Sequence, residues 1–451
     1  MIFIYIFSLP LLFGLLAVIL KNNSLNTVLV LTHSLIHLGA SLAMALSSTG
    51  LAQSLGVDSL SSTFLLISAL LYFAVALYSL KLKTELDPRQ SSIYSICLML
   101  FVASMDGANL SRDLGLIWVF VESTTLASAM LISFERGKQS LEAAWKYLFI
   151  CSIGIAIAFV GILLLIIAQS GLPSLNLDRV LAQASSLSPF WLKLSFVFIL
   201  VGFGTKIGLA PMHFWLPDAH SEAPAAVSAL LSGALLNTAL LPLLRMRTVM
   251  DLSGMGSLAS QAFLVLGFLS IFVAAVFIVK IRNFKRMLAY SSIENMGIIL
   301  IAFGLGDLAG KAGLIHVMGH SLIKAAFFLT AGNIYQIYHQ KDSDKCSGLL
   351  DLDPGSGWLW LIAYAFIIGM PPSPLFLSEL YIAIGLMNSG NIIGLTLFFI
   401  LLASIAWGLG RAVLQISMGK SERRSVLPLS QYLPQMLLLL SAVALFVYLM
   451  I

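Results

Sequence analysis

Residues 201–220 read VGFGTKIGLAPMHFWLPDAH, an apolar stretch with a single lysine and several helix-breaking residues. Three glycines surround Lys206, and two prolines follow it within eleven positions. Proline interrupts helical hydrogen bonding, and broken helices at membrane depth are tolerated where the freed backbone groups line a protein or water cavity. The stretch therefore predicts a membrane helix that is broken beside a buried charge.

The composition of the whole chain agrees with a membrane protein. Of 451 residues, 59% are hydrophobic and 10% are charged, and the mean hydropathy is +0.99. These values exclude an ordinary soluble globular domain. The cysteines, Cys97, Cys151 and Cys346, lack the spacing that holds zinc or an iron–sulfur cluster. We therefore expect no redox centre and no metal site in this chain.

Apolar runs of about 20 residues, the length that crosses a bilayer, divide the chain into fourteen predicted transmembrane helices. They lie near residues 2–20, 25–47, 60–80, 91–108, 114–134, 144–168, 192–213, 223–244, 259–280, 288–306, 311–338, 357–387, 391–417 and 430–451. The first run lacks the basic start and cleavage site of a signal peptide, so we expect it to be retained. An even number of spans predicts both termini on one side.

Basic residues are distributed unequally between the predicted loops. Of the 25 Lys and Arg, 16 follow odd-numbered spans: Lys21, Lys81, Lys83, Arg89, Arg136, Lys138, Lys280, Arg282, Lys285, Arg286, Lys341, Lys345, Arg411, Lys420, Arg423 and Arg424. Six follow even-numbered spans: Arg112, Arg179, Lys193, Arg245, Arg247 and Lys311. Cytoplasmic loops carry the excess of positive charge. The termini are therefore expected to face outward, and the net charge of +5 needs no nucleic-acid partner.

Three lysines fall inside predicted spans instead: Lys146, Lys206 and Lys324. A charge at the centre of a membrane helix costs at least about 2.5 kcal/mol, so such residues are usually paired, hydrated or functional. Glu122, in IWVFVESTTLASAML (117–131), and Glu379 are acidic counterparts within apolar spans. We expect Glu122 to form a switchable ion pair with a lysine of the sixth or seventh span. A static pair that only fixes helix packing is the competing interpretation.

The eleventh span places three titratable groups on one helical face. In LIHVMGHSLIKAAFFL (314–329), His316, His320 and Lys324 are spaced four residues apart. Two imidazoles and an amine one turn apart suit a proton relay if water links them. Two alternatives stay open: structural histidines with satisfied hydrogen bonds, and a metal site, which lacks a nearby glutamate of the HExxH kind.

A second broken helix is predicted in the twelfth span. The stretch IIGMPPSPLFLSELY (367–381) places three prolines before Glu379. The two breaks are fourth in spans 4–8 and in spans 9–13, which predicts two inverted five-helix repeats. The expected segments are residues 1–90, the repeats 91–250 and 251–420, and a last helix in 421–451.

These motifs together resemble a known family. The stretches APMHFWLPDAHSEAPAAVSALLSG (210–233) and KRMLAYSSIENMG (285–297), with the contexts of Glu122, Lys206 and Lys324, resemble the proton-translocating antiporter-like subunits of respiratory complex I. Subunits of cation/proton antiporters and of membrane-bound group 4 nickel–iron hydrogenases are similar. The DAHSEAP and SSIENMG segments, and Glu379 in place of a lysine, resemble the hydrogenase-4 and formate hydrogenlyase branch most.

The resemblance implies the fourteen-helix fold and a role for each matching residue. Glu122 and Lys206 match the coupling pair, and Lys146 matches a sixth-helix residue that modulates it. Lys324, with His316 and His320, matches a central relay, and Glu379 matches a terminal proton site. Possible accessory residues are His213, His220, Asn237 and Glu294. His213 and His220 could instead cap and position the turn after the broken helix.

Departures from the family pattern concern Asn237, where several relatives carry lysine, and Asn283, which replaces an aspartate often found there. The gap at Asn237 would need water to bridge it. Asp58 has no assigned role. The resemblance also implies a subunit without the long lateral helix of the most distal complex I subunit.

The resemblance implies transport within an oxidoreductase complex of a prokaryotic cytoplasmic membrane. The expected partners are other membrane subunits and a peripheral redox module that holds nickel–iron and iron–sulfur centres. Alternatives are a subunit of a cation/proton antiporter or of an ion-coupled inorganic-carbon uptake system, and a membrane scaffold whose buried charges do not conduct.

Overall fold

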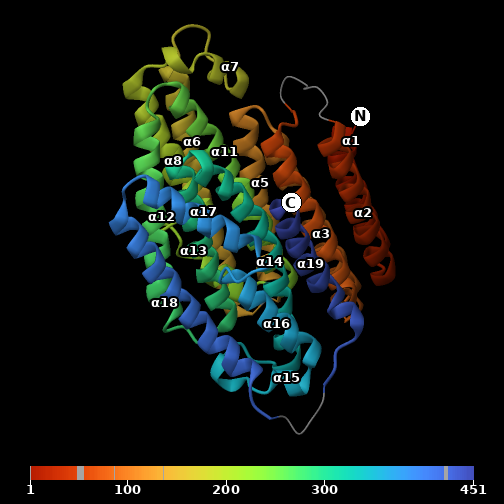
Figure 1. The fold of residues 1–451 in the computed structure, drawn as a ribbon. Coiled ribbons are helices and arrows are strands. Elements are labelled where there is room, and N and C mark those ends of the chain that lie inside the picture. The colour runs from red at the N-terminus through yellow and green to blue at the C-terminus, as the bar shows by residue number, and fades with distance from the viewer. Residues whose placement is uncertain (1, 48–54, 86, 136, 421–424) are drawn as a thin grey trace. The chain divides into compact units, whose positions relative to one another are not determined.

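The structure is a computed structural model that describes residues 2–47, 55–85, 87–135, 137–420 and 425–451, and these form an almost entirely helical chain (Figure 1). Of the basic residues used to predict orientation, Arg136, Arg423 and Arg424 lie outside the described residues. In the described part, β structure is limited to isolated bridges such as that between Asp113 and Asn176. The chain divides into two compact units, which are described separately.

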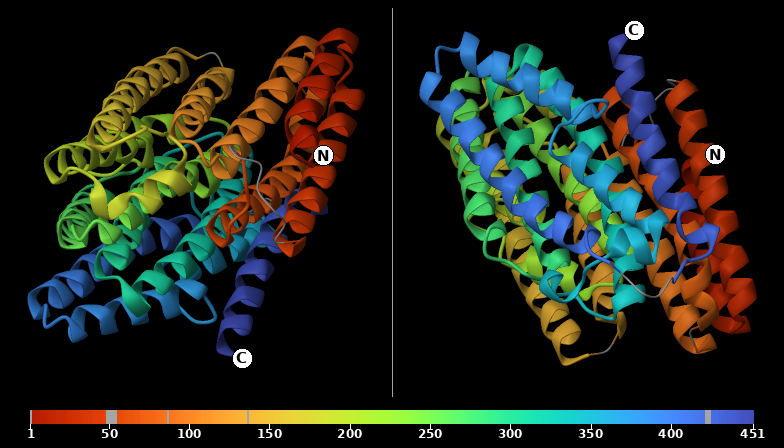
Figure 2. Two further views of the ribbon diagram at one scale, coloured as in Figure 1. Left: turned by 90° about the horizontal axis from the view of Figure 1, so that it is seen from above. Right: turned by 60° about the horizontal axis from the view of Figure 1, so that its bottom comes forward.

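Unit 1 comprises Met1–Gly208 and Ala234–Ala259. Its helices are α1 (Ile2–Leu20), α2 (Asn23–Ser47), α3 (Ser59–Glu85), α4 (Pro88–Leu110), α5 (Leu114–Ile132), α6 (Lys138–Ala168), α7 (Leu177–Ala182), α8 (Pro189–Ile207) and α11 (Leu236–Leu252). The N-terminal helices α1, α2 and α3 lie side by side in all views (Figures 1 and 2). Helices α6 and α8 form another extensively packed pair.

Unit 2 comprises Leu209–Gly233 and Ser260–Ile451. Its helices are α9 (Trp215–Glu222), α10 (Ala225–Leu230), α12 (Gly256–Ile278, apart from its first turn), α13 (Phe284–Leu305), α14 (Asp307–Tyr338), α15 (Leu349–Leu352), α16 (Pro354–Ile367), α17 (Pro374–Asn388), α18 (Ile392–Ser417) and α19 (Leu433–Met450). Helix α14 is its centre, because α13, α16, α17 and α19 all pack against it.

The predicted spans agree with the observed helices. Among the described residues, twelve helices are long and apolar enough to cross a membrane, and the shorter apolar helices Phe7–Leu20 and Pro374–Asn388 fall in the first and twelfth predicted spans. Each of the fourteen predicted spans therefore has a helical counterpart. The eighth span is one continuous run, Ala225–Leu252, with a π-helical turn at Leu231–Leu235.

Both predicted helix breaks are present. Helix α8 ends at Ile207, and Gly208 caps it with a φ of 82°, the left-handed conformation that glycine adopts at helix C-termini. The chain becomes helical again at Trp215. In the twelfth span, α16 ends at Ile367 and α17 begins at Pro374. The glycines and prolines thus predicted the positions of both breaks.

An ion-pair network in unit 1 gives Asp58 a structural role. The Asp58 carboxylate accepts a hydrogen bond from the Ser61 amide at 2.6 Å, which caps the start of α3. Arg112 binds both Asp58 and Asp178, and Arg245 lies 3.8 Å from Asp58. Burial alone would raise the pKa of Asp58, but the Ser61 amide and the two arginines together hold that pKa below its usual value of 3.8.

Replacing Asp58 is expected to destabilise the protein in a pH-dependent way. Asp58→Ala should cost about 1–2 kcal/mol at neutral pH, a typical effect of losing a helix cap, and Asp58→Asn should cost less because asparagine also caps. A carboxylate whose pKa is lowered by folding stabilises the fold above its unfolded pKa, and this contribution disappears as the pH falls through its folded pKa. Thermal unfolding in detergent should therefore show the wild type and Asp58→Asn converging below about pH 4. A pH-independent difference would contradict this account.

Candidate functional site

Lys206 occupies the last turn of α8, directly before the break, and its side chain is completely buried. Its ammonium group donates hydrogen bonds to the Thr125 hydroxyl at 2.9 Å and to the Tyr147 hydroxyl at 2.6 Å. The same ammonium lies 4.6 Å from the centre of the Tyr147 ring. Tyr147 in turn shares a 2.6 Å hydrogen bond with Ser128. The buried charge is therefore solvated by hydroxyl groups and an aromatic face.

Glu122 is joined to Lys206 through Thr125. The Glu122 carboxylate accepts hydrogen bonds from Ser152 at 2.6 Å and from Thr125 at 3.4 Å. In the described part of the chain no salt bridge within 4 Å joins Glu122 to a lysine, and the predicted pair of Glu122 with Lys206 is separated by the Thr125 hydroxyl. A hydroxyl can accept from an ammonium while it donates to a carboxylate. Thr125 thus bridges the acid and the base.

Close packing of α6 on α8 positions this group. A Cβ atom added to Gly202 would lie 2.5 Å from the backbone nitrogen of Ala158, and one added to Gly154 would lie 2.7 Å from the Thr205 side chain. Only glycine allows the two backbones to approach so closely. The contact brings Tyr147 and Ser152 of α6 near the end of α8. The glycines around Lys206 therefore serve helix packing as well as the break.

Lys146 does not belong to this group. Its side chain is 48% exposed in this chain and forms a 2.7 Å salt bridge with Glu142, one turn earlier on α6. The same face of α6 exposes Trp145 and Phe149. The prediction that Lys146 is buried was wrong. Lys138, Glu142 and Lys146 recur every four residues along the first turns of α6 and form one exposed polar face.

In unit 2, α14 places His316, His320 and Lys324 along its length, and all three are fully buried. His316 bridges two other helices. One ring nitrogen lies 2.8 Å from the Ser378 hydroxyl of α17, and the other lies 3.0 Å from the Asn295 side-chain oxygen of α13. The predicted spacing on one face is confirmed, and the bridge connects α13, α14 and α17.

Lys324 binds the Leu288 carbonyl oxygen of α13 at 2.9 Å. The charges of Lys324 and Glu294 act on each other, and Glu294 is only 5% exposed. Neither ring nitrogen of His320, which lies between Lys324 and His316 in sequence, has a hydrogen-bond partner among the described residues. A buried imidazole of this kind is available for water or a proton.

Helix α9, after the first break, brings His220 to the same region. The His220 ring stacks on Phe328 of α14 at 5.0 Å between centroids, and its nitrogens have no hydrogen-bond partner among the described residues. It lies within electrostatic range of Lys324 and of Lys285. Lys285 itself is 4% exposed and donates to the Ala223 carbonyl oxygen. Assigning Lys285 to a cytoplasmic loop was wrong, because α13 begins one residue before it.

The remaining predicted residues have distinct surroundings. His213 stacks on Phe214 and meets the Tyr290 ring edge-on in the segment between α8 and α9. Glu379 is partly buried on α17, and its carboxylate fills the space beside Gly369, at the second break. Asn237 is buried on α11, two residues after the π-helical turn.

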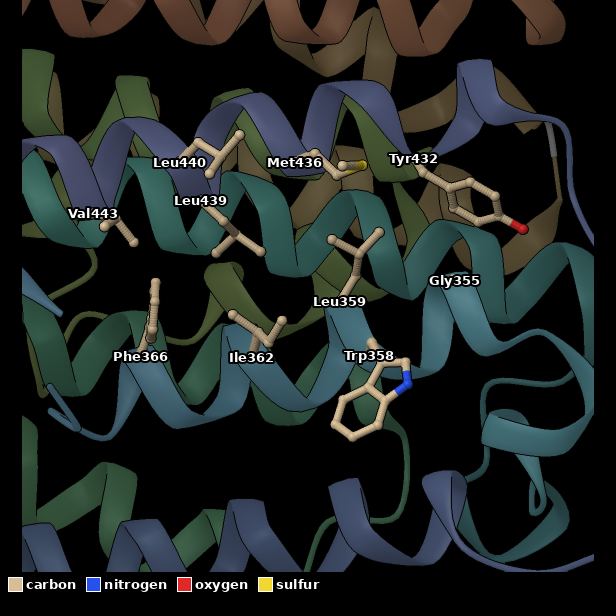
Figure 3. Close-up of a pocket in the computed structure, with 10 residues that line it drawn as sticks. All are labelled: Gly355, Trp358, Leu359, Ile362, Phe366, Tyr432, Met436, Leu439, Leu440 and Val443. Atoms are coloured by element: carbon tan, nitrogen blue, oxygen red, sulfur yellow. The ribbon is translucent and has the colours of Figure 1, made fainter. Parts of the chain in front are cut away.

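No cluster of three or more His, Cys, Asp or Glu residues that could hold a metal ion occurs within the described ranges. Unit 2 also contains a groove of about 440 Å³ between α16 and α19 (Figure 3). Its lining is almost wholly apolar, with Trp358, Phe366 and Met436 among the side chains. The hydroxyl of Tyr432, at one end, is bound to Asp353. The residues that line this groove therefore include none of the Lys, His or Glu residues described above.

Helices of membrane-spanning length, two breaks and buried charges define an antiporter-like integral membrane subunit. Residues 111–405 match the model of the NADH:quinone oxidoreductase/Mrp antiporter transmembrane family, and the chain belongs to this family. The matched region of this chain, residues 111–405, contains Glu122, Lys206, Lys324 and Glu379.

Two curated relatives carry hydrogenase names. The chain is 35% identical over 390 residues to a hydrogenase-4 component F homolog of Methylacidiphilum infernorum, covering 84% of this chain and 82% of the relative. It is 31% identical over 342 residues to hydrogenase-4 component B of Escherichia coli, covering 72% of this chain and 50% of that protein.

Solved structures share the fold. A chain of an archaeal membrane-bound sulfane sulfur reductase aligns with a TM-score of 0.90 at 22% identity, over 99% of this chain and 94% of the other. A chain of the Mrp complex from Dietzia gives 0.88 at 18% identity, with the same coverages. A chain of respiratory complex I from Thermus thermophilus gives 0.82 at 22%, over 99% and 97%. The predicted all-helical antiporter-like fold is confirmed.

Proposed function

We propose that this chain is the proton-translocating subunit of a multisubunit redox complex of the hydrogenase-4 type. The observation that carries the proposal is the bridge Glu122–Thr125–Lys206 at the end of a broken helix. An acid and a base joined by one hydroxyl can exchange a proton when the energy of either charged form changes. The similarity to a hydrogenase-4 component F homolog supports the choice of complex.

The residues of unit 2 supply a second part of the proposed route. Lys324 and Glu294 lie within electrostatic range of each other, and His316 connects α13 to α17. Glu379 lies within electrostatic range of Glu294 and stands beside the second helix break, so it is the proposed terminal site of this group. We assign no chemistry of bond making to this chain; the redox centres, nickel–iron and iron–sulfur, would belong to partner subunits.

We also propose the orientation given by the basic residues. The loops after odd-numbered spans hold most of the Lys and Arg even without the buried Lys285. They would face the cytoplasm of a prokaryotic cell, and both termini would face outward. The expected partners are further membrane subunits and a peripheral redox module.

Purification of the intact complex from native membranes tests the proposal. Subunits of a nickel–iron hydrogenase are expected to co-purify, and the complex in sealed vesicles is expected to move protons during electron transfer. Movement that requires sodium and proceeds without electron transfer would favour a cation/proton antiporter instead, a reading that the family name also covers. A flavin and NADH-binding module in place of the hydrogenase would overturn the assigned complex.

A further inference from the structure

A second group of buried titratable side chains lies in the N-terminal helices of unit 1. This N-terminal histidine cluster consists of His33 and His37 on α2, Ser68 and Tyr72 on α3, and Asp106 on α4. It lies before residue 111, where the family match begins. It shares no residue with the Glu122–Lys206 group.

The centre of the cluster is a short pair between His37 and Asp106. The His37 Nε2 and Asp106 Oδ2 atoms are 2.6 Å apart, and the two side chains are 2% and 1% exposed. The second carboxylate oxygen accepts a hydrogen bond from Ser68 at 3.3 Å. An ionisable pair within membrane helices is costly, and it therefore marks a candidate functional site.

The cluster continues from His37 to a second histidine, one turn away on α2. The ring centroids of His33 and His37 are 6.1 Å apart, a separation that one water molecule can bridge. The Nδ1 atom of His33 lies 2.8 Å from the Tyr72 hydroxyl. The Tyr72 ring packs against both histidines, at 5.4 and 5.9 Å between centroids. Four groups that can exchange protons thus follow one another across α2, α3 and α4.

The surroundings contain few other charges. Phe13 of α1 covers His33, and Tyr94 of α4 is the further titratable group whose charge acts on Tyr72. The Nδ1 atom of His37 is buried and has no hydrogen-bond partner among the described residues. A pair that served only to fasten α2 to α4 would leave this nitrogen buried without a hydrogen bond, which destabilises the fold and gives nothing in return. An imidazole held by a carboxylate at one nitrogen and available at the other is arranged for proton transfer.

We propose that the N-terminal histidine cluster is a proton-transfer site, a second one in this subunit. A proton received at Nδ1 of His37 forms the imidazolium, and the Nε2 proton passes to Asp106, which becomes a neutral carboxylic acid. The imidazole is left neutral with its proton on Nδ1. Asp106 then releases its proton, and the ring turns so that its Nδ1–H faces Asp106 and its unprotonated Nε2 faces the donor. This arrangement is equivalent to the starting state, so one proton crosses for each cycle. The inference rests on the proposed transport function.

The decisive variant is His37→Gln in the intact complex. Glutamine can keep a hydrogen bond to Asp106 but cannot take up a proton. We expect normal assembly in the membrane and a fall of at least about tenfold in proton movement in sealed vesicles, because a positioned proton-transfer group typically contributes about 10²–10⁴-fold in rate. Asp106→Asn is expected to cause the same loss of proton movement with normal assembly. Normal assembly with wild-type proton movement over the whole working pH range would show a structural pair and overturn the inference.

A second pair of variants covers the case in which His37→Gln does not assemble. Tyr72→Phe with Ser68→Ala keeps the His37–Asp106 pair and removes only the Tyr72 hydroxyl bonded to His33 and the Ser68 hydroxyl bonded to Asp106. Slower proton movement, with normal assembly and a changed pH profile, is expected, and an unchanged rate and profile would overturn the inference. The variant Lys206→Met distinguishes a failure of this inference from a failure of the proposed function. If Lys206→Met transports normally, the proposal that protons pass through the Glu122–Lys206 group is refuted. If Lys206→Met is inactive while the cluster variants are active, only the inference about the cluster is refuted.

Discussion

Lys206→Met is expected to abolish proton movement by the intact complex while electron transfer by the peripheral module continues at least in part. Methionine fills a similar volume but has no charge and no hydrogen to donate to Thr125 or Tyr147. The acid–base exchange with Glu122 then has no base. Proton-transfer groups of this kind contribute about 10²–10⁴-fold in rate, so residual movement should be near the background of empty vesicles. A pH-sensitive dye inside sealed vesicles provides the measurement.

Lys146→Met is the matched control, since it makes the same chemical change on the neighbouring helix. Lys146 is half exposed and paired with Glu142 by a salt bridge, the kind of surface pair that is worth about 0–1 kcal/mol. The control is expected to keep most of the wild-type proton movement. Equal losses in both variants would mean that the buried position of Lys206 is not what matters, and normal movement in Lys206→Met would remove the basis of the proposed function.

Sequence reasoning located the helices and their breaks because the signals are local. Twenty apolar residues must be helical in a bilayer, where the backbone has no water to bind. Gly208 and the prolines before Glu379 interrupt helices by their own backbone properties. Residues 201–220 also predicted the buried lysine at the first break, Lys206. These features need no knowledge of neighbouring helices.

The errors concern which way a side chain faces. Lys146 and Lys206 both lie in apolar helices, yet one faces outward and the other is completely buried. On α6 the polar residues Lys138, Glu142 and Lys146 recur every four residues, so the helical period, rather than the apolar character of the span, marks the outward face. Lys285 was assigned to a loop because helix ends are uncertain by a few residues, and this uncertainty decides whether a charge is exposed.

The bridging groups were missed for a different reason. Thr125 and Ser378 are ordinary residues in apolar helices, and only tertiary contacts show that they join titratable partners. The N-terminal histidine cluster had a visible signal, because His33 and His37 are one turn apart and Asp106 interrupts an apolar span. The rule that drew attention to Lys206, an ionisable residue inside a membrane helix, applies to these residues equally.

His316→Phe is expected to lower proton movement at least about tenfold, as is typical of removing a positioned proton-transfer group. The His316 ring is the link between Asn295 on α13 and Ser378 on α17, next to Glu379. Phenylalanine keeps the ring shape but removes both nitrogens. The buried Asn295 oxygen loses its bond to His316, a cost of about 1–3 kcal/mol, whereas the Ser378 hydroxyl keeps its bond to the Leu375 carbonyl oxygen. Assembly of the complex is therefore measured first, and proton movement is compared per assembled complex.

Thr330→Ala controls for loss of a buried polar group on α14, because among the described residues the Thr330 hydroxyl bonds only to the Ala326 carbonyl of its own helix. It should assemble and transport normally. His316→Gln, which can still bond at least one partner, should restore assembly more than transport if His316 carries protons. If glutamine restores transport as fully as assembly, His316 is a structural bridge, since an amide side chain holds helices together without taking up a proton.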